Sequence, residues 1–520
     1  MKNLFGIVIL LSNFSDHFFK SINLTIKKVM ERSSGSSIPR RKPLTANVGI
    51  YSVGHHTYWS QFDGLLDEIK NKITAFEAIL ARYDVNVIDF GISDCAETAY
   101  STVPKINAAD LDLLFVDMVT YATSATIGII FREVRVPVVL VALQPLKALD
   151  YNKASTYMQL LNDDICAVPE FNSVALRMGR KIPPVIIGTL YDDKAAKAEI
   201  EGFCKIAHVL HDLKRARIGQ MGHVLEAMLD MHTDPTLLTS AFGCHIVLTE
   251  PEDIYRHYLK ITDSDIQKEK EKILGFFDTP DPGSDPVAVR LTGDDLTEAA
   301  RAGIALEKFI TGKRLDGLAY YYESMEDSGI RLLMSNLIVG NSLLTASGFP
   351  MCGESDLKTC IAMMIMDRLE MGGSFAEFHP VDFNEGFVLV GHDGPHHINI
   401  AEGKPLLRSL LKYHGKPGKG ASVEFKIREG PITMLGITQK ADGKFKFVIA
   451  EGESVSGPVP PTGNTNTRGF FKPDVRTFLK RWFSEGPTHH FALGIGHQAQ
   501  LIKQIAEFLD IDSVVIDTKQ

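Results

Sequence analysis

The sequence predicts an α/β protein with three domains: two doubly wound, parallel-sheet α/β domains followed by a β-rich, barrel-like C-terminal domain. Three observations support this prediction. The chain of 520 residues is too long for one hydrophobic core. Before Gly373, continuous apolar runs alternate with helical segments, which is typical of βαβ units in a sheet covered on both faces. After Gly373, short strand-like runs are separated by turns, as in an antiparallel barrel or sandwich.

The first domain is expected at residues 46–213. Its apolar runs predict five strands, at residues 47–54, 85–91, 111–118, 136–143 and 182–188. A helical pattern at residues 62–83 lies between the first two strands. Ligands of open parallel sheets bind at the carboxyl ends of the strands. His56, Tyr58, Met118 and Gln144 lie at these ends and are therefore candidate substrate-binding residues.

The second domain is expected at residues 214–372 and the third at residues 373–520. In the second domain, strands are predicted at residues 216–218, 244–254 and 318–323. Helices are predicted at residues 285–315, 332–340 and 357–369, and a surface loop at residues 276–285. In the third domain, Asp442-Gly443 predicts a hairpin turn. The remaining predictions there are a polar loop at residues 463–471, a helix at 498–509 and a last strand at 513–517.

The composition is that of an ordinary globular protein, with 45% hydrophobic and 23% charged residues. The net charge of −9, without a long basic stripe, disfavours a general nucleic-acid binder. Six cysteines occur without a CxxC pair. This pattern fits a reducing compartment, and we expect a cytoplasmic protein without a disulfide framework.

The first 45 residues need a separate interpretation. The apolar run Leu4–Leu11 has the length of a signal-peptide core, but it is too short to span a bilayer. Residues 33–43 are polar and basic, as in a disordered linker. We expect residues 1–45 to be a disordered or dispensable extension, with Met30 as an alternative start; an export signal is the other interpretation. No membrane partner is expected.

Two carboxylates and two imidazoles in the last third of the chain stand at the ends of predicted elements. Glu354 precedes the helix at 357–369, and Glu377 lies in a partly apolar strand. His392 and His497 each follow an apolar strand and a glycine. Each residue alone has a structural explanation, such as a helix-dipole acid, an ion pair or a hydrogen-bonded histidine. Together they are the ligand types that a divalent cation takes from several elements.

The surrounding motifs carry a family resemblance. GESDLKT (353–359), SFAEF (374–378), GHDG (391–394) and GIGH (494–497), in this order and with these intervals, resemble the metal-binding motifs of L-arabinose isomerase and its relatives, among them L-fucose isomerase. The resemblance covers residues 47–520. It implies a fold with a sheet domain, a second α/β domain and a β-rich C-terminal domain, in agreement with the pattern of apolar runs.

The resemblance also implies an activity, interconversion of an aldose and a ketose, and a cofactor, Mn²⁺ or another divalent ion. Glu354 and Glu377 match the glutamates that bind the metal and move the protons, and His392 and His497 match the metal histidines. Arg217, in KRARIGQM, joins the substrate-binding candidates. The resemblance further implies a homo-oligomer, trimer or hexamer, in which a neighbouring N-terminal domain completes each site.

Three positions depart from the arabinose enzymes. Leu357 stands where they have tryptophan, and Phe378 stands where they have an acidic residue. They also carry two adjacent histidines near the C-terminus. Here His497 matches the first of the two, and Gln498 stands at the position of the second. His379, His489 and His490 are assigned no role. The motifs therefore predict isomerase chemistry without predicting which sugar is used.

The chemistry can also be derived from the residue types. Moving a proton between C1 and C2 of an open-chain sugar through an enediol requires a base and an acid, and the two glutamates can divide these roles. A divalent cation stabilises the charge that develops on oxygen. Two alternatives stay open. One is a non-catalytic sugar-binding protein on the same scaffold, and the other is a different divalent-metal enzyme of sugars, such as an epimerase or a hydrolase.

Overall fold

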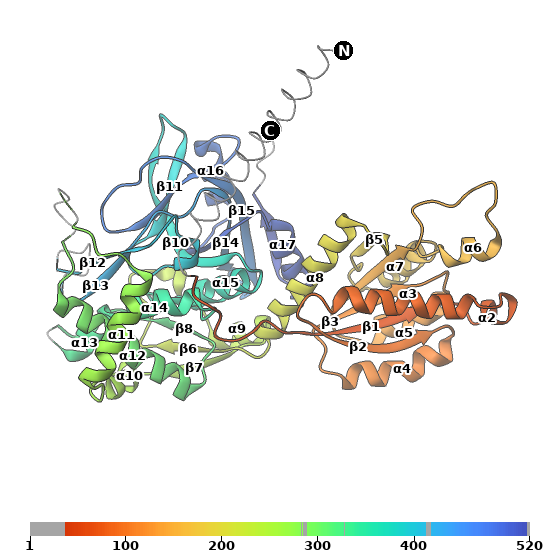
Figure 1. Ribbon diagram of the computed structural model, residues 1–520, viewed down its shortest axis with the longest axis horizontal. Helices are drawn as coiled ribbons and strands as arrows, with labels where there is room; N and C mark the ends of the chain where they lie inside the picture. Colours follow the sequence, from red (N-terminus) through yellow and green to blue (C-terminus); the bar gives the residue numbers. More distant parts are fainter. Residues whose placement is uncertain (1–36, 282, 284–288, 327, 412–417, 517–520) are drawn as a thin grey trace, which may run out of the picture.

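A computed structural model describes residues 37–281, 283, 289–326, 328–411 and 418–516. Figure 1 shows two bodies side by side, with the N-terminal sheet on one side and the second sheet and the barrel together on the other. The long helix α8 (Lys194–Leu213) runs between them, next to the C-terminal helix α17 (Ala499–Phe508). No helix among the described residues is long and apolar enough to cross a membrane.

The N-terminal sheet has five parallel strands in the order β2-β1-β3-β4-β5. All five strands were predicted from their apolar runs: β1 (Asn47–Val53), β2 (Asn86–Ser93), β3 (Leu113–Met118), β4 (Val138–Gln144) and β5 (Val185–Thr189). The connecting helices, besides α8, are α2 (Thr57–Gln61), α3 (Leu65–Leu80), α4 (Ala96–Ala108), α5 (Ala125–Glu133), α6 (Thr156–Leu161) and α7 (Val168–Arg177). Strand β3 is buried along its whole length, as expected for a strand covered on both faces.

The second sheet has four parallel strands in the order β7-β6-β8-β9. They are β6 (Arg217–Met221), β7 (His245–Thr249), β8 (Gly317–Tyr320) and the very short β9 (Met351–Cys352). Around them lie η1 (Leu229–Met231), α9 (Pro235–Phe242), α10 (Pro251–Tyr258), α11 (Asp263–Phe276), α12 (Gly293–Lys313), α13 (Gly329–Ser335), α14 (Leu337–Ala346) and α15 (Leu357–Arg368). The helix predicted at 285–315 begins at Gly293, because Thr292 and Asp295 form a capping box there.

The C-terminal region is a closed barrel of six antiparallel strands, which confirms the predicted barrel-like domain. The strands follow the order β14-β17-β10-β11-β16-β15, and pairing of β14 with β15 closes the ring. They are β10 (Gly372–Asp382), β11 (Phe387–His392), β14 (Gly430–Gln439), β15 (Phe445–Val455), β16 (Thr465–Phe470) and β17 (Phe491–Ile495). The other elements are η2 (Ile398–Ile400), the hairpin β12 (Leu406–Ser409) with β13 (Ala421–Glu424), α16 (Val475–Ser484), α17 and β18 (Asp512–Val515).

The polar loop predicted at residues 463–471 is wrong, because most of this segment is strand β16. Its sequence, TNTRGF, has the low apolar content of a loop. Its polar side chains are nevertheless buried and bonded: Thr467 lies 2.5 Å from the hydroxyl of Ser454, and Thr465 accepts a hydrogen bond from the backbone of Phe425. Closure of the barrel therefore overrides the intrinsic preference of the segment.

Helix α15 joins the second sheet to the barrel. All twelve of its residues are buried, since it packs against β8, against the barrel strands β10, β14 and β17, and against α8. A helix that is enclosed on every side carries no polar face, which agrees with its sequence LKTCIAMMIMDR. The loop that precedes α15 is consequently held where the carboxyl end of the second sheet meets the barrel.

Residues 37–45 form an ordered strap, although the sequence suggested a dispensable extension there. Arg40 forms an ion pair with Asp367 of α15 at 2.6 Å, and the backbone of Ile38 bonds Asn399. Lys42 pairs with Asp316 at 2.5 Å. Residues 1–36, including the apolar run Leu4–Leu11, lie outside the described residues.

Asp117, at the carboxyl end of β3, is a buried carboxyl group. Burial raises its pKa to about 7, against the opposing effect of the ammonium of Lys72. That ammonium also pairs with Asp164 at 2.6 Å. The N-terminal sheet therefore holds a carboxyl group that resists ionisation.

We predict that Asp117→Asn stabilises the protein at pH 8 but not near pH 4. An unfolded aspartate titrates near about pH 3.9, so between about pH 4 and 7 the native state keeps a proton that the unfolded state has lost. The free energy of unfolding then falls as the pH rises, by roughly 4 kcal/mol at most. Urea denaturation at both pH values measures this change, with the exposed Asp67→Asn as control; the same effect at both pH values would contradict it.

Candidate metal centre

Glu354 lies in the loop between β9 and α15, at the carboxyl end of the second sheet. Glu354 and Ser355 both have left-handed backbone, with φ of 60° and 61°. Such conformations cost about 1–3 kcal/mol each in residues other than glycine, and they cluster at functional sites. The turn is fixed by a hydrogen bond from the backbone of Ser355 to Tyr320 at 3.0 Å. It points the carboxylate of Glu354 toward the barrel, where its Oε2 lies 3.4 Å from Nε2 of His490.

Glu377 and His392 are brought together by the register of two barrel strands. Glu377 of β10 pairs with Gly391 of β11, so His392 is the next residue along. The Nε2 atom of His392 lies 3.9 Å from Oε1 of Glu377. A side chain at Gly391 would place its Cβ 1.9 Å from the carbonyl of Thr465, so only glycine fits beside His392. This explains the glycine in the GHDG motif.

His489 and His490 precede β17 and belong to the same cluster, although the sequence analysis gave them no role. Phe491 pairs with Ala376 of β10, and antiparallel pairing therefore places His490 beside Glu377. His489 donates to Glu377, with 2.6 Å between Nε2 and Oε2. The signal in the sequence is the adjacent histidine pair itself, which the motif comparison had placed at His497 and Gln498.

The structure does not bring His497 to this cluster. His490 and His497 flank the two ends of β17, and a strand advances about 3.3 Å per residue. Nε2 of His497 lies 3.0 Å from the carbonyl of Gly452 and 3.4 Å from the carboxylate of Glu453. Within the described residues, the acid–imidazole groups compact enough for one cation do not include His497.

The atoms that face one another can fit a divalent cation. The groups that could hold one ion are Glu354 with His392 and His490, Glu377 with His489 and His490, and Glu377 with His392 and Asp393. Carboxylate and imidazole atoms bound to one small divalent ion lie about 2.0–2.2 Å from it, hence at most about 4.4 Å apart. The pairs at 3.4 Å and 3.9 Å satisfy this limit. Phe375 packs against the rings of His392 and His490.

The electrostatics of the cluster also suit a cation. Burial raises the pKa of Glu377, but the hydrogen bond from His489 and the nearby imidazoles outweigh it and lower that pKa to about 2. The same hydrogen bond raises the pKa of His489. Glu377 is therefore a carboxylate at neutral pH, held among imidazoles that a metal ion could bind in place of protons.

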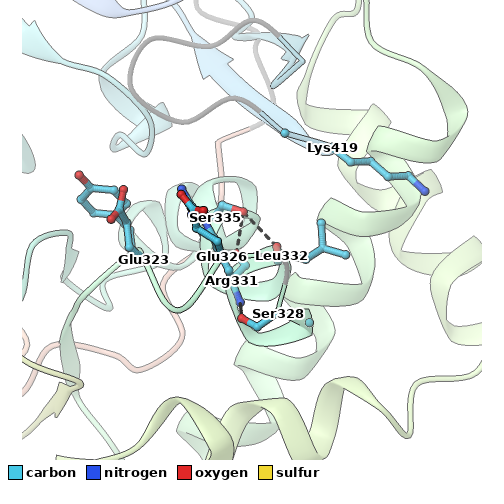
Figure 2. A pocket seen from close by; sticks show the side chains of 10 residues that line it. Glu323, Glu326, Ser328, Arg331, Leu332, Ser335 and Lys419 are labelled. Carbon is cyan, nitrogen blue, oxygen red and sulfur yellow. Dashed lines mark hydrogen bonds and ion pairs between the residues drawn. The ribbon is translucent and has the colours of Figure 1, made fainter.

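Two cavities lie next to the cluster. The inner one, of about 10 Å³, has room for a single ion or water and is lined in part by Glu354, Phe375, His392 and Asp393. The outer one, of about 560 Å³, shares Tyr322 and Ser335 with it. Figure 2 shows the charged and hydroxyl side chains of the outer cavity, among them Glu323, Glu326, Ser328, Arg331 and Lys419. The two cavities therefore border one another at Tyr322 and Ser335.

Two of the positions that depart from the family pattern lie away from both cavities. Leu357 is buried in the first turn of α15. Phe378, which follows Glu377 on β10, packs into an aromatic cluster with Trp482 and Phe491. Neither side chain is among the described residues that line the two cavities. The differences at Leu357 and Phe378 therefore do not change the residues that line the two cavities.

The predicted substrate-binding residues of the N-terminal sheet lie elsewhere in this chain. His56 and Tyr58 flank the start of α2, at the far end of the N-terminal body from β10 and β11 (Figure 1). Met118 is buried at the end of β3, and Gln144 bonds the carbonyl of Leu146. Arg217 is the first residue of β6. The loop that follows the other end of β6 contacts Glu354, through a hydrogen bond from the backbone of Leu225. A substrate-binding role for these five residues stays a prediction.

The fold and the cluster define a class: an α/β protein with a barrel and a candidate divalent-cation centre where the two meet. Comparisons with known proteins agree. Residues 408–517 match the family model described as L-fucose isomerase, C-terminal domain. An L-arabinose isomerase of Nocardioides sp. is 25% identical over 394 residues, covering 74% of this chain and 76% of that protein. One of Klebsiella pneumoniae subsp. pneumoniae is 24% identical over 386 residues, covering 71% and 74%.

These matches support a divergent member of the family of L-arabinose and L-fucose isomerases. Members of this family are named for aldose–ketose isomerisation of particular sugars. At about 25% identity, these relatives support aldose–ketose isomerisation as the reaction class, without indicating the sugar.

We predict that His490→Gln weakens Mn²⁺ binding and that His497→Gln does not. Loss of an imidazole ligand is expected to cost more than the roughly 10–100-fold seen for groups that only orient a ligand. Titration calorimetry of metal-stripped protein measures both affinities, and the two variants are matched in chemistry and differ only in position. An affinity that falls in His497→Gln and survives in His490→Gln would reverse the assignment.

Proposed function

We propose that the protein is a metal-dependent intramolecular oxidoreductase that interconverts an aldose and a ketose. The observation that carries the proposal is the meeting of Glu354, from the second sheet, with Glu377, from the barrel, around shared imidazoles. The L-arabinose isomerases that resemble the chain support the same reaction class. The substrate is a small sugar, which we do not narrow to arabinose.

In this proposal Glu354, Glu377, His392 and His490 hold Mn²⁺ or another divalent ion. Such an ion, when bound, supplies Lewis-acid polarisation of the sugar's carbonyl and hydroxyl oxygens. His490 takes the place that the motif comparison gave to His497, since it lies within reach of both glutamates. His489 holds Glu377 in its ionised form through the 2.6 Å hydrogen bond.

The two glutamates divide the proton transfers between C1 and C2 and their oxygens, through an enediol. Glu377 is ionised at neutral pH and can accept a proton. Both glutamate side chains are mostly buried, with 14% and 18% of their surface exposed, which limits exchange of the transferred proton with water. The polar outer cavity gives room for the rest of the sugar (Figure 2).

The proposal includes a homo-oligomer, trimer or hexamer, and a cytoplasmic location. The position of His56 and Tyr58, far from the cluster within one chain, supports a site that a neighbouring N-terminal domain completes. The cysteines Cys95, Cys166, Cys204, Cys244, Cys352 and Cys360 are all free, which supports a reducing compartment.

We predict that Glu354→Gln and Glu377→Gln each lower ketose formation by about 10²–10⁴-fold or more, because each removes an acid–base group and an anionic ligand. The measurement is a screen of pentoses and hexoses with Mn²⁺-loaded protein, followed by rates on the best substrate. Glu453→Gln, beside His497, is the matched control and should keep wild-type rates. Substantial activity in Glu377→Gln with a normal melting temperature would contradict the mechanism.

A further inference from the structure

We propose that a cavity beside the strap is a binding site for a small phosphorylated ligand. The cavity has a volume of about 350 Å³, within the range of about 300–1,000 Å³ that is typical of small-molecule sites. The strap, the end of α12 and the end of α15 all contribute to its walls. Among the described residues, five cationic side chains line it: Arg40, Arg41, Lys42, Arg314 and Arg368.

The cavity is separate from the candidate metal centre. Arg368 is the last residue of α15, whereas Glu354 precedes the first turn of this helix. Twelve residues of α-helix span about 18 Å. Of the described residues that line the cavity, none belongs to the acid–imidazole groups of the cluster. The inference therefore does not depend on the proposed isomerase reaction.

The composition of the walls favours an anion. Two carboxylates of the described residues, Asp212 and Asp316, line the cavity together with the five cations. Ile310, Leu315 and Phe349 also line it and are almost fully buried. The local dielectric constant beside such apolar side chains is lower than in water, which strengthens the attraction between a cation and a bound anion. A ligand with more than one negative charge, such as a phosphate ester, fits these walls.

Arg314 is the cation that is free to bind such a ligand. Its side chain is exposed and forms no ion pair with the described residues. The end of α12 does not need this side chain, because the backbone N–H groups of Arg314 and Leu315 donate to the carbonyls of Thr311 and Ile310. The backbone of Arg314 is also left-handed, with φ of 55°, a conformation that favours glycine. The turn itself therefore does not call for an arginine.

Arg41 and Lys42 have partners that a phosphate can replace. Arg41 pairs with Glu307 at 2.6 Å, but 48% of the Glu307 side chain is exposed. Lys42 pairs with Asp316 at 2.5 Å, although 76% of the lysine side chain is exposed. Ion pairs at such exposed positions contribute little to stability. A phosphate accepts two parallel hydrogen bonds from a guanidinium, so it competes well with a single contact to a carboxylate.

Arg40 and Arg368 form the fixed side of the cavity. Both lie 2.6 Å from Oδ2 of Asp367, a carboxylate that is only 7% exposed. Gly348, with φ of 89°, leaves room for the guanidinium of Arg40, because a Cβ atom at this position would lie 2.9 Å from its Nη2. The strap is thus held against α15 from one side, while the more exposed cations face the ligand from the other.

Fastening of the strap alone explains less of this arrangement. Pairing with carboxylates accounts for the cations of the strap and for Arg368. It does not account for Arg314, which lies outside the strap and belongs to no such pair among the described residues. Nor does fastening require a cavity between the charged groups. A bound phosphate group explains both features.

Titration calorimetry of metal-stripped, full-length protein with inorganic pyrophosphate tests the proposal. Removal of metal prevents pyrophosphate from binding through a metal ion. We expect saturable binding of one pyrophosphate per chain, which weakens as NaCl is added because salt screens exposed charges. Arg314→Gln and Arg41→Gln should each weaken this binding roughly tenfold or more. Their melting temperatures should stay close to wild type, because the described partner of Arg41, Glu307, is itself exposed.

Two further arginines serve as controls. Arg177 is likewise exposed at the end of a helix, α7, and Arg177→Gln should leave the affinity for pyrophosphate unchanged. Arg331 lines the outer cavity beside the metal cluster, and Arg331→Gln should also leave this affinity unchanged. Absence of saturable binding by the wild-type protein would overturn the proposal. So would an affinity that is lost in Arg331→Gln and kept in Arg314→Gln, since it would place the anion in the outer cavity.

Discussion

The docking of α15 against the barrel is the constraint on which the candidate site depends. The loop before α15 supplies Glu354, and the barrel supplies Glu377, His392 and His490. Neither part alone contains all the carboxylates and imidazoles of the cluster. Burial of all twelve residues of α15 fixes the relative position of the two parts. The chemistry of the site is thus a product of tertiary packing.

Several features near the site cost free energy that other contacts must offset. Two consecutive left-handed residues begin the turn at Glu354, and a buried lysine and aspartate follow it. Each would be unfavourable as isolated structure. Their concentration within five residues, at the point where sheet and barrel meet, is the pattern expected where backbone and charge are arranged for binding. The apolar body of α15 and its neighbours supplies the compensating burial.

Much of the architecture could be predicted from the sequence, because buried parallel strands leave continuous apolar runs. Glu354, Glu377 and His392 stand in short motifs, and the structure brings them into one cluster, as the sequence led us to expect. Strand β16 could not be predicted, since its polar residues are satisfied only by partners across the barrel. The place of His490 in the cluster could not be predicted for a related reason. The start of β17 lies beside Glu377 only through antiparallel pairing, and His490 precedes its strand instead of following it.

The most direct test of the account is a crystal structure of the protein grown with Mn²⁺, with an anomalous difference map. The account predicts one strong peak within bonding distance of Glu354, Glu377, His392 and His490. A peak bound instead by His497 and Glu453, or no peak at the meeting of α15 and the barrel, would contradict it.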